Sequence, residues 1–201
     1  NRTPFIKAKG KPGNFSASDL AVYAARDMLA RLPIQPEDID EVVTGCMMPS
    51  EDEANVSRIV SLRLGCGKHT PAYTVQRNCA SGMQALDNAY KDIKLGRRNL
   101  MLAGGCEAMS RAPLLFNQHM VNWFASWMRA KTMPQKLGML AKVRPAMLAP
   151  VIAILRGLRD PIVGLSMGQT AEEVAFLFNI TRKEMDEFAL NSHKKLAHAM
   201  D

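Results

Sequence analysis

Hydrophobic and polar positions along the first half of the chain follow two alternating periods. Between residues 20 and 32, apolar residues recur every four positions, which predicts an amphipathic helix with Ser18 at its N-terminus. The apolar run EVVTGCMMP, residues 41 to 49, closes on a glycine and a proline and predicts a short buried strand. A helical pattern returns over residues 54 to 64.

The same alternation continues over the next 40 residues. AYTV, residues 72 to 75, is a β-prone run, and a helical pattern follows from 80 to 95 with Gly96 as its C′ residue. The apolar stripe of this helix comprises Met83, Leu86, Tyr90 and Ile93. NLMLAGG, residues 99 to 105, predicts a further buried strand. Helices and strands therefore alternate three times, which favours a layered α/β sheet.

The pattern changes after Phe116. Both tryptophans and most of the basic excess lie beyond it, with five methionines between residues 117 and 163, and four prolines divide the segment into short pieces. We therefore place a domain boundary here, with a core at 1–116 and an inserted helical region at 117–201. Two ordinary helices are predicted near its end, with capping boxes formed by Thr170 with Glu173 and by Thr181 with Glu184.

Composition narrows the class of protein. A chain of 201 residues that is 47% hydrophobic can build a sizeable core, and its apolar runs are too short for a transmembrane helix. The first residues lack the pattern of a signal peptide. Four cysteines are spread without a CxxC pair, which predicts reduced thiols in a cytosol or organelle matrix. Neither they nor the four histidines have the spacing of metal ligands, so no metal site is expected.

Positive charge is concentrated in one segment. The net charge is +7, and residues 117 to 163 hold seven basic residues against Asp160 alone. Such a segment can be a solvated basic surface over a Trp–Met cluster, a surface for anionic membranes, or a long-range attractor of phosphates. Basic charge without a nucleic-acid motif does not predict nucleic-acid binding.

Cys79 is the candidate for chemistry. It lies between a predicted strand and a predicted helix, where α/β folds present nucleophiles and where the helix dipole favours a thiolate by about 0.3–1 kcal/mol. The small residues that follow it leave room for a carbonyl, and its own backbone N–H can stabilise an oxyanion. Activation still needs a base. The alternative is a buried structural cysteine. Cys46, Cys66 and Cys106 have no such setting, and we expect them to be core or turn residues.

Four segments of the sequence, taken in chain order, help to decide whether Cys79 is a nucleophile or a structural cysteine. NCASGMQAL around Cys79 resembles the acyl-enzyme motif of the thiolase family. RTPF at the start, AGGCEAMS about 25 residues after the cysteine and SMGQTAE near 166 to 172 resemble three further segments of that family. One departure is Gln76, where the family usually has Asn, Ser or Thr. The resemblance implies the N-terminal half of a thiolase fold, layered α-β-α-β-α, with an inserted helical loop domain.

The resemblance also implies roles for single residues. Cys79 is the expected acyl carrier, and its backbone N–H the expected oxyanion donor. Met167 is expected to line the pocket for the pantetheine and acyl groups of acyl-CoA, with an ordinary apolar residue at a helix start as the alternative. Gly104, Gly105 and Glu107 are expected to be scaffold residues, and Ser81 a support of the turn. No cofactor is implied, since coenzyme A is a substrate.

The implied activity is thiolytic cleavage of 3-ketoacyl-CoA by coenzyme A in fatty acid β-oxidation, in the bacterial cytoplasm or the mitochondrial matrix. A biosynthetic acetoacetyl-CoA thiolase is the alternative within the class, and a non-catalytic docking module is the alternative outside it. The segment 117–160 resembles the extended loop of the β-subunits of fatty-acid oxidation complexes, which implies contact with a membrane or with an α-subunit. A homodimer or a dimer of dimers is implied as well, and we predict its contact at residues 50–75.

Some thiolase segments are missing from the sequence. The family's Gly-His-Pro, its Asn-Glu-Ala-Phe and its second catalytic cysteine do not occur. Three accounts fit: a fragment of a longer enzyme, which we favour, one part of a split enzyme, or an inactive product.

Overall fold

The computed structural model describes residues 1–4, 11 and 13–200. Phe5, the last residue of the RTPF segment, lies outside this range. The chain divides into two compact units, Asn1–Pro113 and Leu114–Asp201, and each is described by itself. This division falls three residues before the boundary predicted from the sequence. The assignment of 117–201 as an inserted loop domain stays a prediction.

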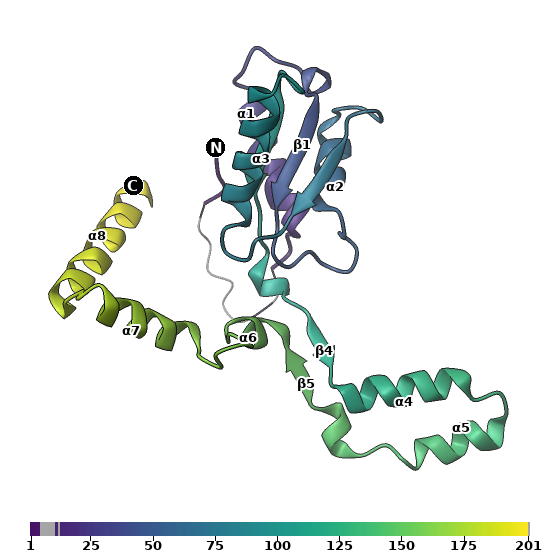
Figure 1. The fold of residues 1–201 in the computed structure, drawn as a ribbon. Coiled ribbons are helices and arrows are strands. Elements are labelled where there is room, and N and C mark those ends of the chain that lie inside the picture. Colours follow the sequence, from purple (N-terminus) through teal and green to yellow (C-terminus); the bar gives the residue numbers. More distant parts are fainter. Residues whose placement is uncertain (5–10, 12, 201) are drawn as a thin grey trace. The chain divides into compact units, whose positions relative to one another are not determined.

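The first unit is built on a parallel three-stranded sheet (Figure 1). Its strands, in the order β2-β1-β3, are β2 (Ala72–Val75), β1 (Glu41–Gly45) and β3 (Met101–Gly105). Its helices are α1 (Ala17–Leu29), α2 (Val56–Leu64), α3 (Ser81–Lys94) and the 3₁₀ turns η1 (Pro36–Asp38) and η2 (Met109–Arg111). The alternation predicted from the sequence is confirmed.

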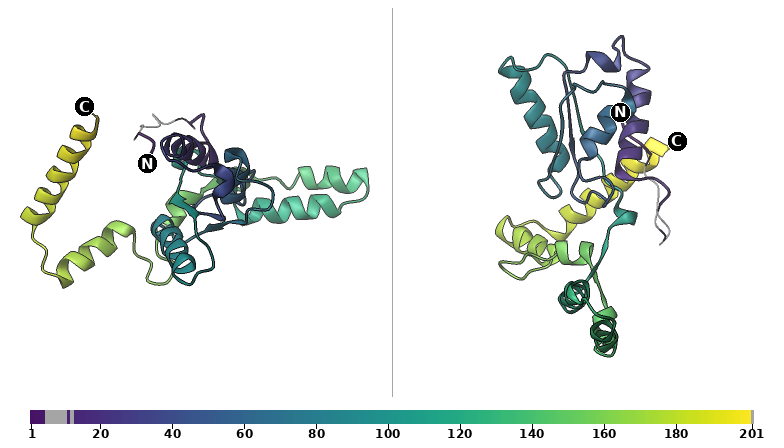
Figure 2. Two further views of the ribbon diagram at one scale, coloured as in Figure 1. Left: turned by 90° about the horizontal axis from the view of Figure 1, so that it is seen from above. Right: turned by 90° about the vertical axis from the view of Figure 1, so that its right-hand side faces the viewer.

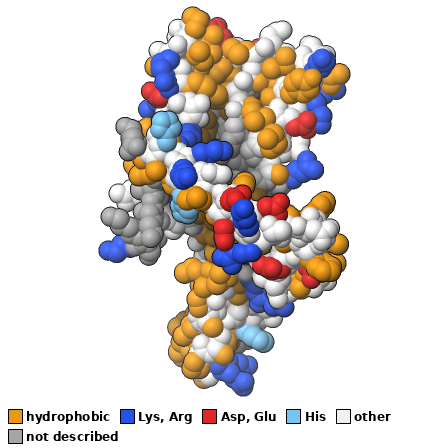
Figure 3. All heavy atoms as spheres, turned by 90° about the vertical axis from the view of Figure 1, so that its left-hand side faces the viewer, with side chains coloured by type: hydrophobic (Ala, Val, Ile, Leu, Met, Phe, Trp, Pro, Cys, Tyr) orange, Lys and Arg blue, Asp and Glu red, His pale blue; other side chains and the backbone are white. Residues whose placement is uncertain are grey.

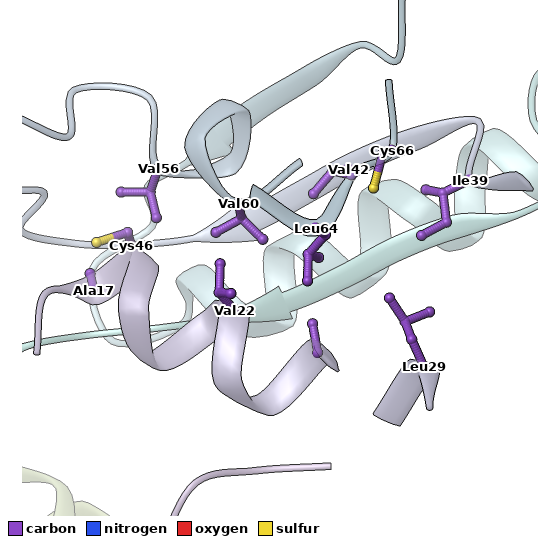
Figure 4. Close-up of a cluster of buried hydrophobic side chains, with 11 residues drawn as sticks. Ala17, Val22, Leu29, Ile39, Val42, Cys46, Val56, Val60, Leu64 and Cys66 are labelled. Atoms are coloured by element: carbon purple, nitrogen blue, oxygen red, sulfur yellow. The ribbon is translucent and has the colours of Figure 1, made fainter. Parts of the chain in front are cut away.

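The two faces of β1 separate the helices into layers. Val42 belongs to a core cluster with residues of α1 and α2, whose side chains point toward the strand in Figure 4. Val43, its neighbour, packs instead on Ala85 and Ala89 of α3. Because successive strand residues point to opposite faces, α1 and α2 cover one face and α3 the other. All five residues of β1 are buried.

Helix α3 packs on the sheet through its small residues. Ala85 and Ala89 are 0% and 7% exposed, whereas Met83 and Tyr90 of the apolar stripe are 70% and 62% exposed. The stripe predicted from the sequence exists, but it faces away from the sheet. Its four large side chains form an apolar surface that the described residues of the first unit leave exposed.

Helix ends in the first unit differ slightly from the prediction. α1 begins three residues early, because Ser16 is the N-cap and forms a capping box with Asp19. The end of α3 agrees with the prediction, since Gly96 adopts a φ of 67° just beyond it.

The second unit is mainly helical. It contains β4 (Leu114–Phe116), α4 (Gln118–Arg129), α5 (Met133–Leu140), η3 (Pro145–Leu148), β5 (Pro150–Ile152), α6 (Ala153–Gly157), α7 (Met167–Leu177) and α8 (Arg182–Met200). β4 and β5 pair antiparallel at the base of a hairpin whose helices α4 and α5 run side by side (Figure 2). Across the residues that the structure places, no helix has both the length and the apolar character needed to cross a membrane.

Asn117 fastens the base of the α4–α5 hairpin. Its side-chain oxygen accepts from the Met120 N–H, and its amide donates to three carbonyls near η3. Further along, the predicted capping box of Thr181 with Glu184 is confirmed. The one predicted at Thr170 is wrong, because α7 begins earlier and Ser166 with Gln169 caps it.

Candidate active site

Cys79 lies in the tight turn that joins β2 to α3. The Ala80 N–H donates to the Arg77 carbonyl at 3.0 Å, which closes the turn around the cysteine. Asn78 adopts a φ of +48°, a left-handed conformation that asparagine tolerates better than most residues. This turn leaves Cys79 exposed, and the alternative of a buried structural cysteine is thereby wrong.

Ser81 holds the turn together. Its hydroxyl accepts from the Arg77 N–H at 2.8 Å and donates to the Asn78 carbonyl at 2.6 Å. The side chain is buried, and both of its hydrogen-bonding directions are used inside the turn. Ser81 is therefore a support of the turn, as predicted, and not a nucleophile.

Three glycines bring the strand ends against the start of α3. A Cβ added to Gly45, the last residue of β1, would lie 2.2 Å from the Ser81 carbonyl carbon and 2.5 Å from the Gly82 nitrogen. A Cβ added to Gly105, the last residue of β3, would lie 3.0 Å from the Gly82 Cα. The helix N-terminus that follows Cys79 therefore rests directly on backbone, which fixes its position.

The backbone N–H of Cys79 is available to a ligand. It donates to no acceptor within the part of the chain that the structure describes. The N-cap residue of α3 is Ala80, whose side chain offers no cap. A free N–H beside an exposed thiol, at the positive end of a helix, can stabilise an oxyanion.

The other cysteines differ from Cys79 in exposure. Cys46 and Cys66 are buried, Cys106 is half-buried, and all four thiols are free. A hydrogen bond with the Cys106 thiol, burial and the nearby charge of Glu107 raise the pKa of Cys46. Burial likewise raises the pKa of Cys66. Cys79 is therefore the one cysteine presented openly to solvent.

The remaining predicted residues have structural surroundings. Glu107 accepts hydrogen bonds from the backbone N–H groups of Met47 and Met48, which supports its reading as a scaffold residue. Gln76 donates to the Met47 carbonyl at 3.5 Å, so this departure from the family pattern has a partner. Met167 is the first residue of α7 and is 44% exposed. It belongs to the second unit, so its role beside Cys79 stays a prediction.

Sequence reasoning missed two features of the site. The approach of Gly45 to Ser81 joins residues 36 positions apart, and nothing in the local pattern marks it. The left-handed Asn78 had a signal, because asparagine before a helix start is a frequent choice for that conformation.

The fold agrees with that of known proteins. The family model "Thiolase, N-terminal domain" matches residues 1–201. A 3-ketoacyl-CoA thiolase of Pectobacterium carotovorum is 34% identical over 200 residues, which are 100% of this chain and 45% of that protein.

Two solved structures are also similar. Human mitochondrial 3-ketoacyl-CoA thiolase, known also in complex with CoA, superposes with a TM-score of 0.77 at 31% identity, over 100% of this chain and 46% of that one. A Bacillus anthracis acetyl-CoA acetyltransferase gives 0.74 at 33% identity, over 96% and 44%.

The first unit is a parallel α/β unit that presents an exposed cysteine between a strand and a helix. The chain belongs to the thiolase family, and it matches the N-terminal domain of that family. It spans about half the length of the curated relatives that it matches.

Proposed function

We propose that this chain is the nucleophile-bearing part of a 3-ketoacyl-CoA thiolase, an acyl-CoA:acetyl-CoA C-acyltransferase of fatty acid β-oxidation. The observation that carries the proposal is the exposed Cys79 with its free backbone N–H on a turn that Ser81 and Gly45 hold rigid. The relatives named 3-ketoacyl-CoA thiolase support the choice of substrate class.

The proposed reaction has two halves. The Cys79 thiolate attacks the keto carbon of a 3-ketoacyl-CoA, and the N–H of Cys79 donates to the developing oxyanion. The carbon–carbon bond then breaks, the electron pair leaves with the acetyl-CoA portion, and a general acid protonates it. In the second half, the thiol of coenzyme A attacks the acyl group on Cys79 and releases a shortened acyl-CoA and a free thiol.

This reaction needs an acid and a base beyond Cys79. The sequence holds no Gly-His-Pro segment, and His69, His119, His193 and His198 all have exposed side chains. We therefore place these groups in a second half of the complete protein. The exposed apolar stripe on α3, with Tyr90 62% and Met83 70% exposed, is the surface that such a half would cover.

Further parts of the proposal concern binding and assembly. We assign Met167 to the pocket for pantetheine and acyl groups, with acyl-CoA and coenzyme A as substrates and no cofactor. The structure of the human relative in complex with CoA supports this substrate. We propose a homodimer through residues 50–75, where the outer edge of β2 has no partner strand in the described sheet. Relatives from bacteria and from human mitochondria favour the cytoplasm or the mitochondrial matrix as the compartment.

Thiolysis in the complete native protein tests the proposal. We expect coenzyme A-dependent cleavage of 3-ketoacyl-CoA that Cys79→Ala abolishes and Cys66→Ala, a change at a buried cysteine, leaves. A series of acyl chain lengths distinguishes the alternative, a biosynthetic acetoacetyl-CoA thiolase, which the similarity to an acetyl-CoA acetyltransferase favours. Activity restricted to the four-carbon substrate would support that alternative.

A second candidate function is docking, and the α4–α5 hairpin favours it. Two apolar stripes are exposed on its helices: Val121, Phe124 and Met128 on α4, and Met133, Leu137 and Leu140 on α5. No acidic residue occurs between residues 108 and 159, while Arg129, Lys131, Lys136, Lys142 and Arg144 are basic. Figure 3 shows this mixture of hydrophobic and basic side chains on the hairpin, at the bottom of the view.

The two tryptophans of this hairpin are half-buried. Trp123 and Trp127 stack at 5.2 Å, and the Trp123 indole N–H donates to the Met139 carbonyl on α5. They stiffen the pair of helices, so that the exposed stripes keep a fixed geometry. We propose that this hairpin binds an anionic membrane surface, and a β-oxidation α-subunit is the alternative partner.

Vesicle flotation distinguishes these partners. We expect the complete protein to float with vesicles that contain phosphatidylserine and to stay unbound with pure phosphatidylcholine. Met128→Glu with Leu137→Glu places acidic groups in both stripes and is expected to abolish flotation. Flotation that survives this double change, or that ignores lipid charge, would contradict the membrane proposal.

A further inference from the structure

The carboxylate of Glu107 lies two residues beyond β3 and binds the chain that leaves β1. Its Oε2 accepts from the Met47 N–H at 2.8 Å and its Oε1 from the Met48 N–H at 3.1 Å. The Cys46 thiol donates to Oε1 at 3.5 Å. Both oxygens of the carboxylate are therefore used by three consecutive residues of one connection.

This connection begins where the nucleophile turn rests. Gly45 and Gly105 are paired in register at the ends of β1 and β3, and the Cys106 N–H donates to the Gly45 carbonyl at 3.0 Å. The same two glycines abut Gly82 at the start of α3. Glu107 thus fastens the two strand exits to each other at the edge of the sheet that supports Cys79.

One further contact joins the connection to the turn itself. The Gln76 side chain, three residues before Cys79, donates to the Met47 carbonyl at 3.5 Å. The Met47 carbonyl therefore accepts a hydrogen bond from the Gln76 side chain, and the Met47 N–H donates one to Glu107. A path of two hydrogen bonds runs from the carboxylate to the base of the nucleophile turn.

We propose that Glu107 is a positioning residue for Cys79, acting through Met47 and Gln76. The inference rests on the proposed thiolase function and adds to it a residue outside the segment that holds the nucleophile. Glu107 does not touch the sulfur in this account. It holds the β1 exit, so that the turn keeps the N–H of Cys79 aimed at the oxyanion.

The chemistry of the contact explains why a carboxylate is needed. Two adjacent backbone N–H groups each need an acceptor, and an ionised carboxylate offers one oxygen to each. Such charge-assisted hydrogen bonds are roughly twice as strong as neutral ones. A glutamine of the same shape would turn an NH₂ group toward one of these N–H donors, so that one bond is lost and two donors face each other.

A matched control exists in the same connection. Glu53 is a buried carboxylate, which accepts hydrogen bonds from Ser16, Ser18 and Ser50, whereas Glu107 is half-buried. It fastens the connection to α1, and among the residues that the structure describes it has no hydrogen bond to the nucleophile turn. Glu53→Gln therefore shows how much stability is lost when a scaffold carboxylate is changed. Glu107→Gln is expected to show a similar loss of stability and, in addition, a loss of activity.

The test measures kcat, KM and the thermal midpoint of the complete native protein, well below the midpoint of each variant. We expect Glu107→Gln to lower kcat about tenfold or more with KM within about twofold, because orientation of the nucleophile acts in the transition state. Glu53→Gln is expected to lower the midpoint and to leave kcat unchanged. Equal kcat values for Glu107→Gln and the wild type, or equal losses in the two variants, would overturn the inference.

A second variant decides the case in which Glu107→Gln does not fold. Gln76→Ala removes an exposed side chain and leaves the core untouched, so the protein is expected to fold. Its kcat is expected to fall by about threefold at constant KM. An unchanged kcat would overturn the proposed path. A wild-type protein without thiolysis would instead overturn the proposed function, and this inference with it.

Discussion

Gly45→Ala is the substitution that the geometry of the site opposes most strongly. The added Cβ would lie 2.2 Å from the carbonyl carbon and 2.3 Å from the carbonyl oxygen of Ser81, and 2.5 Å from the Gly82 nitrogen. All three neighbours are backbone atoms, so no flexible side chain can move aside. To bring the nearest contact from 2.2 to 3.4 Å, the start of α3 must retreat by about 1.2 Å.

This retreat has two measurable costs. Overpacking of a core contact typically costs about 1–3 kcal/mol of folding free energy, and we expect about 3 kcal/mol here because backbone must move. The turn that carries Cys79 moves with the helix start. A misplacement of about 1 Å at a reacting group can lower the rate about 100-fold.

Gly104→Ala is the matched control. Gly104 precedes Gly105 on β3, pairs with Thr44 of β1, and has no atom within 4 Å of an added Cβ. We expect urea unfolding and thiolysis of the complete protein to be nearly normal for Gly104→Ala and strongly impaired for Gly45→Ala. Wild-type stability and activity in Gly45→Ala, or equal damage in both variants, would refute the steric reasoning.

Three other predictions concern the turn, the thiols and acid stability. Asn78→Ala is expected to lower the free energy of unfolding by about 1 kcal/mol relative to Asn78→Gly, since alanine is strained at a φ of +48°; equal urea midpoints would contradict this. Cys79 is expected to react with iodoacetamide before any other cysteine in the native protein, as peptide mass mapping can show; earlier labelling elsewhere would contradict its exposure. Hydrogen bonds from the Asn99 and Leu100 N–H groups lower the pKa of Asp40 below its ordinary value of 3.8. Because the folded pKa is the lower one, this stabilisation is present above pH 3.8 and is lost as the pH falls through the folded value. Unfolding of Asp40→Asn should therefore depend less steeply on pH in this range, and identical slopes would contradict the assignment.

Local patterns in the sequence predicted the elements of the fold. The order of helices and strands in the first unit, the left-handed Gly96 and the capping box of Thr181 with Glu184 all follow from residues within a few positions of each other. The error in the predicted helix cap also involves residues that are close together in the sequence. At α7 two capping boxes compete, and the serine four residues upstream of Thr170 forms the cap.

Local sequence patterns could not predict the contacts between distant segments. Glu107 and Met47 are 60 residues apart, and only the parallel pairing of β1 with β3 brings them together. The direction of the α3 stripe was equally hidden. A helix that rests on backbone at Gly45 needs small side chains toward the sheet, so Ala85 and Ala89 face inward and the large residues face outward.

The candidate nucleophile was predictable because two kinds of signal coincide at Cys79. A strand–turn–helix pattern alone fits a structural cysteine as well, and the order of four family-like segments decided between the two readings. Only the structure shows the contacts that hold the cysteine in place. These are the two hydrogen bonds of Ser81 and the close approach of the glycines.

The most direct measurement is the intact mass of the complete native protein after brief exposure to acetyl-CoA. The account predicts a single added acetyl group that peptide mapping places on Cys79 and that Cys79→Ala removes. A protein that remains unmodified, or an adduct that persists in Cys79→Ala, would contradict the assignment of Cys79 as the acyl carrier.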